Sequence, residues 1–380
     1  MNATADSRPD TAPPSFSEPP AAVEAWLLKV PLERPYKLSF GPVNEFDTVL
    51  VRVTRSDGTE GYGEATLLTG YTDETIGETW RRTRELIGAM ADPAFDAEAA
   101  LSALDASHPF LTTALRSADE MAQGSPLLRL ERPVRVPILG LLQGDSRERL
   151  EAETVSLLEA GYRTLKVKVG FDPARDAELV AHAQQAVAGR ASLRLDANQG
   201  YTADQARDFL SRLRPDHIEL FEQPCAAGDW DAHMRALPVA RERGIPLMLD
   251  ESIYTLREIE QAARLQAAAF VKVKLMKFNS VARLDAAIVR IRELGLRPVL
   301  GNGVANDLGC WMEACVAARR IDNAGEMNGF LKPRGRLLGE PLPFEDGAIV
   351  LRPGFVPRVD PAALDAFRLD HVSTEKLSIA

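Results

Sequence analysis

The chain has 380 residues, a length that favours two domains, or one large domain with an addition. Hydrophobic residues make up 45% and charged residues 26%, which is ordinary for a globular protein and excludes a largely disordered chain. The 45 Lys and Arg against 55 Asp and Glu leave a formal net charge of −10. An acidic chain is a poor partner for nucleic acid or anionic lipid, so we expect neither.

No apolar run approaches the ~20 residues that a membrane-spanning helix needs. The three cysteines, Cys225, Cys310 and Cys315, have no CxxC spacing and cannot form a disulfide framework, so we expect a reduced, cytoplasmic protein. Residues 1–20 contain five prolines among polar residues and lack the basic start and apolar stretch of a signal peptide. They are predicted to form a flexible tail.

Residues 21–134 have the pattern of an α+β domain. Alternating strands flank the turn at Ser56-Asp57-Gly58, which is typical of a hairpin. Two helical stretches follow, and Pro109 is expected to break the second. The predicted strands are Val23–Val30, Asp47–Arg55 and Tyr62–Ala65, and the predicted helices run from about Thr75 to Met90 and from about Ala97 to Ala122.

From residue 135 to residue 338, short β-rich runs alternate with amphipathic helices. Reference positions near the strand ends, at residues 168, 196, 222, 250, 274, 302 and 326, are 24 to 28 residues apart. Eight such units favour a closed (β/α) barrel over an open sheet. The predicted strands are Val136–Leu141, Thr164–Val169, Ser192–Ala197, His217–Glu222, Pro246–Asp250, Phe270–Leu275, Pro298–Asn302 and a weak one at Ile321–Glu326. The predicted helices are Arg147–Glu159, Pro173–Ala188, Ala203–Leu213, Trp230–Arg243, Thr255–Leu265, Val281–Leu294 and Asp307–Arg319.

Residues 339–380 form the last segment. It contains a strand-like run, Ala348–Leu351, and is expected to fold back on the first domain.

Three successive predicted strands end in a carboxylate: Asp196, Glu222 and Asp250. The carboxyl ends of barrel strands meet on one face, so we expect these side chains to converge. Converging carboxylates repel one another and resist ionising, and a divalent cation removes that repulsion. Oxygen ligands with open positions suit Mg²⁺ rather than zinc, and Mn²⁺ can substitute. The alternative is a salt-bridge network with nearby lysines.

The strands on either side of these carboxylates end in lysines. Side chains alternate along a strand, so Lys166 and Lys168 share one face of the second strand, and Lys272 and Lys274 share one face of the sixth. Lys168 and Lys274 therefore approach the barrel axis from opposite sides. A lysine is a base only when neutral, and neighbouring positive charges favour the neutral form. Two such bases can take the α-proton of a metal-bound carboxylate from one face and return it to the other, through a metal-stabilised enediolate.

Five runs carry a resemblance to a known family: Thr164–Gly170, Arg194–Gly200, Phe221–Pro224, Leu249–Ser252 and Val273–Lys277. In this order they resemble the enolase superfamily. They are most similar to the muconate-lactonizing-enzyme subgroup of the mandelate racemase/muconate lactonizing enzyme family, which uses a lysine on both strands two and six. The resemblance implies a TIM-like (β/α) barrel, with an N-terminal α+β capping domain that the C-terminal segment completes.

The resemblance also implies roles for individual residues. The capping-domain hairpin corresponds to Asp47–Ala65, and the returning segment corresponds to Glu345–Phe367. We also expect a homo-oligomer that acts on a small-molecule carboxylate. The implied roles are metal ligands at Asp196, Glu222 and Asp250, acid–base residues at Lys168 and Lys274, a contact with the substrate carboxylate at Lys166, and supporting polar groups at Asn198 and Glu251.

Three further residues are expected to contact the substrate. Glu326 resembles the glutamate found near strand eight in muconate cycloisomerases. Asn302 belongs to a glycine-containing loop after strand seven, and Tyr71 belongs to a capping-domain loop. Strand eight lacks the Asp-x-Asp of dipeptide epimerases, which disfavours dipeptide substrates.

The first hypothesis is a Mg²⁺-dependent isomerase: a racemase, an epimerase or a cycloisomerase. A lyase of the same superfamily, such as a dehydratase or an o-succinylbenzoate synthase, uses the same half-reaction and remains open. A metal-free Schiff-base aldolase would use the strand-six lysine but would leave the three carboxylates unexplained. A non-catalytic barrel is disfavoured, because buried unpaired charges are costly to keep without a function.

Overall fold

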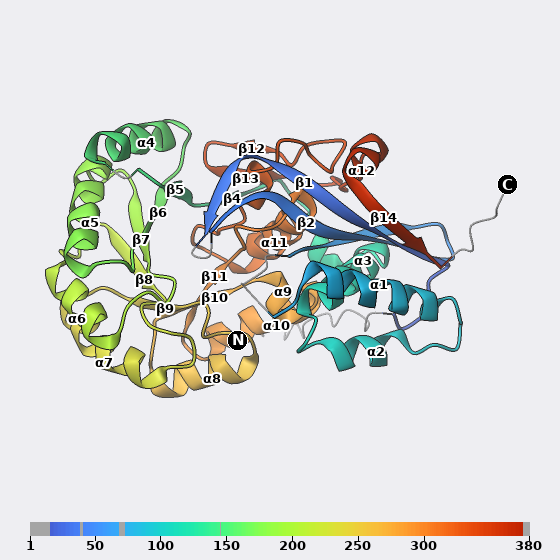
Figure 1. The fold of residues 1–380 in the computed structure, drawn as a ribbon, viewed down its shortest axis with the longest axis horizontal. Coiled ribbons are helices and arrows are strands. Elements are labelled where there is room, and N and C mark those ends of the chain that lie inside the picture. The colour runs from blue at the N-terminus through green and yellow to red at the C-terminus, as the bar shows by residue number, and fades with distance from the viewer. Residues whose placement is uncertain (1–15, 39–40, 68–72, 145, 375–380) are drawn as a thin grey trace, which may run out of the picture.

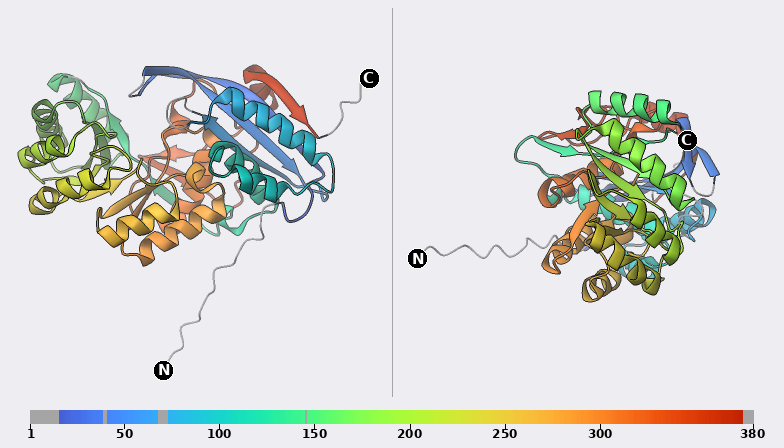
Figure 2. Two further views of the ribbon diagram at one scale, coloured as in Figure 1. Left: turned by 60° about the horizontal axis from the view of Figure 1, so that its bottom comes forward. Right: turned by 90° about the vertical axis from the view of Figure 1, so that its left-hand side faces the viewer.

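The structure, a computed structural model, describes residues 16–38, 41–67, 73–144 and 146–374. A capping domain and a barrel domain lie at opposite ends of the long axis of the molecule (Figure 1). The left view of Figure 2 shows the same separation. Helix α12 (Pro361–Phe367) and strand β14 (Arg368–Ser373) lie beside the capping domain, so the chain returns at its end to the domain with which it begins.

The capping domain is built on a four-stranded sheet in the order β14-β1-β2-β3. Its first three strands are β1 (Ala22–Leu38), β2 (Gly41–Thr54) and β3 (Glu60–Leu67). Along β2, Val49, Val51 and Val53 pack into the core of the capping domain, whereas Phe46 and Leu50 pack into the main core on the opposite face. Because side chains alternate along β2, both faces of this sheet are buried. One face packs in the capping-domain core and the other in the main core, so the sheet connects the two domains.

Three helices cover the capping sheet: α1 (Ile76–Met90), α2 (Ala97–Leu104) and α3 (Pro109–Ala122). Pro109 begins α3, as predicted from the break expected there. Helix α3 lies directly against β3 where that strand carries Gly61 and Gly63. A Cβ atom at Gly63 would lie 2.0 Å from the Ala114 carbonyl oxygen, so this contact requires glycine.

The barrel contains seven parallel strands in the order β11-β10-β9-β8-β7-β6-β5. Their order along the sheet follows their order along the chain, which confirms the predicted β/α repeat. The strands are β5 (Gly140–Leu142), β6 (Thr164–Lys168), β7 (Ser192–Asp196), β8 (Ile218–Glu222), β9 (Leu247–Leu249), β10 (Phe270–Val273) and β11 (Arg297–Leu300).

The eighth position of the barrel is not a regular strand. The Glu326 amide donates to the Leu300 carbonyl (2.9 Å) on one side, and the Leu139 amide donates to the Gly325 carbonyl (2.8 Å) on the other. One parallel bridge, Ile138 to Gly325, completes the closure. The segment around Gly325 has few β-branched residues, so it closes the barrel with isolated hydrogen bonds instead of a ladder.

The barrel helices agree with the predicted periodicity, and two of them agree to the residue. Ser146 and Asp229 accept a hydrogen bond from a backbone amide in the first turn of α4 and α7, so the start of each helix is fixed locally. The predicted sixth strand is shorter, since β10 ends at Val273 and the short α9 (Leu275–Phe278) begins soon afterwards. The other helices are α4 (Arg147–Glu159), α5 (Pro173–Val187), α6 (Ala203–Arg212), α7 (Trp230–Arg243), α8 (Leu256–Leu265), α10 (Val281–Glu293) and α11 (Asp307–Arg320).

The C-terminal segment divides its contacts between the two domains. Strand β14 pairs with β1, which confirms that the segment completes the capping domain. The predicted strand Ala348–Leu351 forms as β13. It pairs with β4 (Val134–Pro137), which directly precedes the first barrel strand in the chain, and with the short β12 (Phe344–Glu345). The segment was expected to fold back on the first domain, and β14 rather than β13 makes the contact with the capping sheet.

Most of the predicted tail, residues 1–15, lies outside the described residues. The Phe16 amide donates to Asp119 Oδ2 (2.6 Å), and the Phe16 ring packs against the core of the capping domain. Residue 16, within the range 1–20 that was expected to be flexible, is thus docked.

Among the described residues, no helix has the length and apolar character that a membrane crossing requires. The three cysteines are buried and unpaired, as their spacing predicted.

Candidate active site

The charged residues that the sequence placed at strand ends meet at one end of the barrel. Lys166 lies in β6, Asp196 ends β7 and Glu222 ends β8, while Asp250 follows β9. The alternation along β6 is as expected, because Val167 packs in the apolar core while Lys166 contacts carboxylates. The barrel topology therefore brings together groups that are 24 to 160 residues apart in sequence.

Lys166 is the centre of an inner ion cluster. Its Nζ lies 2.8 Å from Asp196 Oδ2, 2.9 Å from Glu222 Oε2 and 2.8 Å from Glu326 Oε2. Lys272 Nζ lies 2.9 Å from Glu222 Oε1 and also pairs with Glu326. All five side chains are buried.

The pKa values in this cluster follow from burial opposed by the neighbouring charges. Burial alone would lower the pKa of Lys166, but Asp196, Glu222 and Glu326 raise it well above the ordinary value. Burial would raise the pKa of Glu326, yet Lys166 and Lys272 hold it well below its usual range. Lys166 and Glu326 are therefore a charged pair.

Lys168 and Lys274 lie on opposite sides of this cluster. Lys168 Nζ lies 2.6 Å from Asp196 Oδ2, and its side chain is 44% exposed. Lys274 Nζ lies 2.9 Å from Asp250 Oδ2, with only 6% of the side chain exposed. Strands β6 and β10 are separated by three other strands in the sheet order, so the two amines reach the carboxylates from different directions.

Lys274 has the environment of a neutral amine. Burial, followed by the positive charge of Lys277, lowers the pKa of Lys274 well below its ordinary value. Lys277 donates to Asp250 Oδ1 (2.8 Å) and to the Asp250 carbonyl oxygen (2.6 Å), and it lies 4.8 Å from the centre of the Tyr254 ring. Lys277 thus holds the carboxylate that Lys274 contacts.

The expected supporting groups connect the carboxylates to one another. The Asn198 amide donates to Asp196 Oδ1 (2.9 Å), and Asn198 Nδ2 donates to Glu251 Oε1 (3.0 Å). Asn198 Oδ1 also accepts from Lys168. Burial and the charge of Asp250 raise the pKa of Glu251 to about 8.

The donor set fits a divalent cation that prefers oxygen. Asp196, Glu222 and Asp250 are buried carboxylates at the ends of adjacent strands, and Glu222 Oε2 accepts no hydrogen bond of good geometry, although Lys166 is near. Glu251 Oε2 also lacks a hydrogen-bond partner. Among the described residues, no group of three or more acidic, His or Cys side chains is arranged so that it could hold a metal ion, and lysine amines lie among the carboxylate oxygens. Burial and the charge of Asp196 raise the pKa of Glu222, a shift that a bound cation would reverse.

The three expected substrate contacts have different outcomes. Glu326 lies in the inner cluster. Asn302 lies at the end of β11, where its side chain forms a closed turn with Val304: Nδ2 donates to the Val304 carbonyl (2.8 Å) and Oδ1 accepts from its amide (3.0 Å). Tyr71 lies outside the described residues. Contact of Glu326, Asn302 and Tyr71 with substrate stays a prediction.

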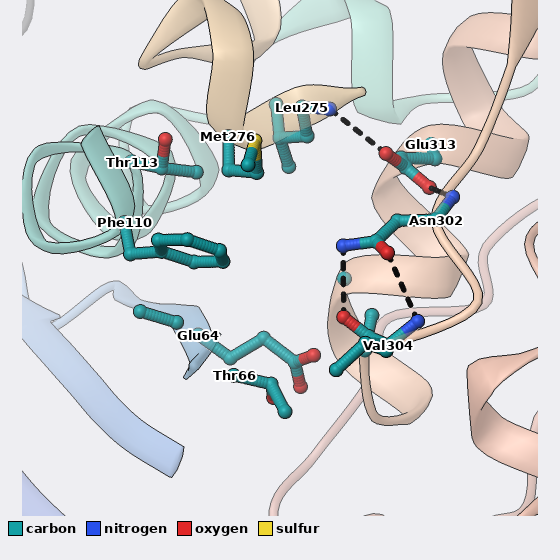
Figure 3. Close-up of a pocket in the computed structure, with 12 residues that line it drawn as sticks. Glu64, Thr66, Phe110, Thr113, Leu275, Met276, Asn302, Val304 and Glu313 are labelled. Carbon is teal, nitrogen blue, oxygen red and sulfur yellow. Dashed lines mark hydrogen bonds between the residues drawn. The ribbon is translucent and has the colours of Figure 1, made fainter. Parts of the chain in front are cut away.

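Glu313 was not identified from the sequence, yet it supports Lys274. It lies on α11 and accepts from the Leu275 amide (2.8 Å) and the Asn302 amide (3.2 Å), so it ties the residue after Lys274 to the loop after β11 (Figure 3). Glu313, Leu275 and Asn302 line a pocket. Glu64 from the capping domain lines the same pocket. A lone carboxylate in the otherwise apolar run Leu308–Ala317 was the available signal.

Lys272 was placed correctly on the inward face of its strand, but no sequence pattern assigned it a role. Its contacts to Glu222 and Glu326 depend on the closure of the barrel.

Comparison with known proteins identifies the family. Residues 149–362 match the model of the enolase C-terminal domain-like family, and residues 22–116 match the N-terminal domain of mandelate racemase and muconate lactonizing enzyme. The chain is 25% identical to the N-succinyl-L-Arg/Lys racemase of Bacillus cereus, over 82% of this chain and 87% of the relative. It is 31% identical to the L-Lys-D/L-Arg epimerase of Methylococcus capsulatus, over 66% and 73%, and 27% identical to muconate cycloisomerase 1 of Rhodococcus opacus, over 88% and 93%.

Solved structures share the fold. The N-succinyl Arg/Lys racemase of Bacillus cereus superposes with a TM-score of 0.82 at 23% identity, covering 93% of this chain and 98% of the other. The dipeptide epimerase of Cytophaga hutchinsonii, solved with Mg and the dipeptide D-Ala-L-Val, superposes with a TM-score of 0.82 at 20% identity, covering 93% and 99%. The two family matches span both domains, and the chain therefore belongs to the mandelate racemase/muconate lactonizing enzyme family of the enolase superfamily.

Proposed function

We propose that this protein is a Mg²⁺-dependent isomerase, a racemase, epimerase or cycloisomerase, that removes the α-proton of a carboxylate substrate. The observation that carries the proposal is the position of Lys168 and Lys274 on opposite sides of a cluster of buried carboxylates. Asp196, Glu222 and Asp250 would hold the cation. When bound, Mg²⁺ supplies positive charge that stabilises the enediolate form of the substrate.

Each lysine has a separate part in this proposal. Lys274 is the base, since burial and the charge of Lys277 lower its pKa and so favour the neutral amine. Lys168, held by Asp196 and Asn198, returns the proton from the other face as the conjugate acid. Lys166 keeps its charge and would bind the substrate carboxylate.

The relatives support an isomerase over a lyase. The similar proteins named above are a racemase, an epimerase and a cycloisomerase, and one similar structure was solved with Mg. The lack of Asp-x-Asp in strand eight disfavoured dipeptide substrates. Since two of the similar proteins are named as epimerases of amino acids or dipeptides, we keep dipeptides as a candidate substrate class.

A one-base reaction is the second candidate, and the unequal lysines favour it. Lys168 is 44% exposed and Lys274 is 6% exposed, so the two are not matched as bases. In a cycloisomerase or a lyase, one lysine transfers the proton while the other provides positive charge.

The test is incubation of the purified protein in D₂O with N-acylated amino acids, dipeptides, betaines and muconates. Deuterium incorporation at the α-carbon, followed by mass spectrometry, is expected for at least one compound and should be lost in EDTA. Trapping of the protein on substrate by borohydride would instead indicate the Schiff-base aldolase. Activity that persists at full rate in EDTA would contradict the metal-dependent mechanism.

A further inference from the structure

A second group of polar atoms lies beside the inner cluster, on Lys332, Asn328 and Tyr36. Lys332 Nζ donates to the Gly303 carbonyl and to Asn328 Oδ1 (2.9 Å), and it lies 4.5 Å from the centre of the Tyr36 ring. Tyr36 comes from the capping domain, whereas the other residues come from the barrel domain. The group therefore spans the boundary between the domains.

The backbone fixes the two sides of this group to each other. The Glu33 amide donates to the Lys332 carbonyl (2.8 Å), and the Arg334 amide donates to the Pro31 carbonyl (2.8 Å). These bonds flank an antiparallel bridge between β1 and the segment that carries Lys332. The positions of Tyr36 and Lys332 are thus coupled through the same strand.

Lys332 has only neutral partners among the residues that the structure describes: a carbonyl, an amide oxygen and an aromatic face. Burial lowers its pKa to about 8, against the charge of Glu326. The Tyr36 hydroxyl makes no hydrogen bond to a described residue, and burial, with the charge of Glu326, raises its pKa to about 12. The Lys332 ammonium and the Tyr36 hydroxyl are therefore two neighbouring hydrogen-bond donors. Among the described residues, neither donates a hydrogen bond to an anionic acceptor.

Gly303 lets these polar atoms lie close together, because a side chain at this position would crowd them. A Cβ atom there would lie 3.1 Å from the Tyr36 hydroxyl oxygen, 3.4 Å from Lys332 Nζ and 3.5 Å from Asn328 Oδ1. Asn328 follows Glu326 by two residues, and Glu326 pairs with Lys166 in the inner cluster. These polar atoms therefore lie near the inner cluster, and none of them belongs to the three expected metal ligands.

We propose that Lys332 and Tyr36, with Asn328, bind a second carboxylate of the substrate at the end away from the reacting carbon. The inference rests on the proposed function, which places the first carboxylate at the metal site. An ammonium group with neutral partners gains charge-assisted hydrogen bonds from a carboxylate, and the phenol adds a second donor. A cationic distal group would be repelled. The expected substrates are dicarboxylates, such as amino acids whose N-acyl chain ends in a carboxylate.

The test uses a matched pair, N-succinyl and N-butanoyl derivatives of the same amino acid, which differ by a terminal carboxylate against a methyl group. We expect the wild type to exchange the α-proton of the succinyl compound in D₂O with a kcat/KM roughly tenfold or more above that of the butanoyl compound. Lys332→Met should remove most of this preference, through a raised KM for the succinyl compound. Tyr36→Phe, which keeps the ring, should give a smaller loss of the same sign. An unchanged preference in Lys332→Met would overturn the proposal.

Arg334→Met is the matched control, since this residue lies two positions further on and its side chain is 69% exposed. It should keep the wild-type preference. A second readout does not depend on turnover: with Mg²⁺ present, glutarate should raise the melting temperature more than butyrate does, and Lys332→Met should remove the difference.

The two readouts separate the two proposals. If no compound exchanges but the glutarate effect depends on Lys332, the proposed function fails and the subsite stands. If exchange occurs and both preferences survive Lys332→Met, or the wild type does not distinguish glutarate from butyrate, the subsite is wrong.

Discussion

Lys168 and Lys274 contact different carboxylates of one cluster, Asp196 at 2.6 Å and Asp250 at 2.9 Å. Lys168 remains partly exposed, whereas Lys274 is buried. Burial and the neighbouring charge of Lys277 lower the pKa of Lys274. The two amines therefore have different environments, even though they occupy equivalent places on opposite strands.

Replacing either lysine by alanine tests the two-base reaction. Lys168→Ala and Lys274→Ala should each lower racemisation by roughly 10²-fold or more, because each removes one proton-transfer group. In a racemase, each variant should still exchange the α-proton of one enantiomer with D₂O, and the two variants should prefer opposite enantiomers. In a one-base reaction, only one variant should lose all exchange, and the environment of Lys274 predicts that it is Lys274→Ala.

Lys29→Ala is the control for these variants, because it removes a lysine whose side chain is 43% exposed in the capping domain. It should leave exchange unchanged. If both catalytic-lysine variants exchange a good substrate at the wild-type rate, proton abstraction by lysine is wrong.

Removal of the metal ligands should abolish both turnover and stabilisation by Mg²⁺. Asp196→Asn, Glu222→Gln and Asp250→Asn each remove one charge from the expected coordination set. In the wild type, Mg²⁺ at a hundredfold excess over Kd should stabilise the fold by about 2.7 kcal/mol, measured as a shift in melting temperature against EDTA. Asp204→Asn, an exposed acid on α6, should keep the full shift. A wild type that melts at the same temperature in Mg²⁺ and EDTA would count against the site.

The parts of the fold that depend on local signals could be predicted from the sequence. Helices α4 and α7 begin and end where their caps and periodicity placed them. The eighth barrel position was predicted only weakly, because the segment around Gly325 makes contacts with two distant strands and has little local preference of its own. The partner of β13 could not be predicted for the same reason: a short apolar strand does not specify which edge it joins.

Some residues of the candidate site could also be predicted from local patterns, whereas others could not. Its charged residues stand at strand ends, and strand alternation alone put Lys166 and Lys168 on one face. The roles of Lys272 and Glu313 depend on contacts across the barrel, to Glu326 and to the amide of Leu275, which no local pattern encodes. Tyr36 reaches the site only because β1 pairs with the segment after Lys332.

The contact between β3 and α3 predicts a large effect of a small change. Gly63→Ala should destabilise the fold by several kcal/mol, because the new Cβ would lie 2.0 Å from the Ala114 carbonyl oxygen and the strand or helix must shift. Gly88→Ala is the matched control in α1, where no heavy atom lies within 4 Å of the added Cβ. It should stabilise by about 0.5–1 kcal/mol, since alanine favours the helix. Chemical denaturation measures both, and equal effects would contradict the close approach.

Glu313 predicts a pH dependence of stability that is separate from catalysis. Burial raises its pKa to about 7, although the amides of Leu275 and Asn302 act in the opposite direction. The ordinary value is 4.5, so between these two pH values the folded protein holds a proton that the unfolded chain releases. The stability that this proton contributes is full below pH 4.5 and is lost as the pH rises through about 7.

Glu313→Gln isolates this effect, because glutamine has nearly the shape of the protonated acid and does not titrate. Glutamine has only one acceptor oxygen, so one of the contacts to the Leu275 and Asn302 amides is weakened at every pH. The free energy of unfolding of the variant is therefore lower by an amount that does not depend on pH. The difference between wild type and variant should then shift in favour of the variant between pH 5 and pH 8, as the wild type alone has to ionise a buried group. The free energy of unfolding in urea at several pH values measures the difference. Glu345→Gln, at an exposed position in β12, should show no such trend. A difference that stays constant from pH 5 to pH 8 would mean that Glu313 is already ionised at the lower pH, held by its two amides and the lysines beside it.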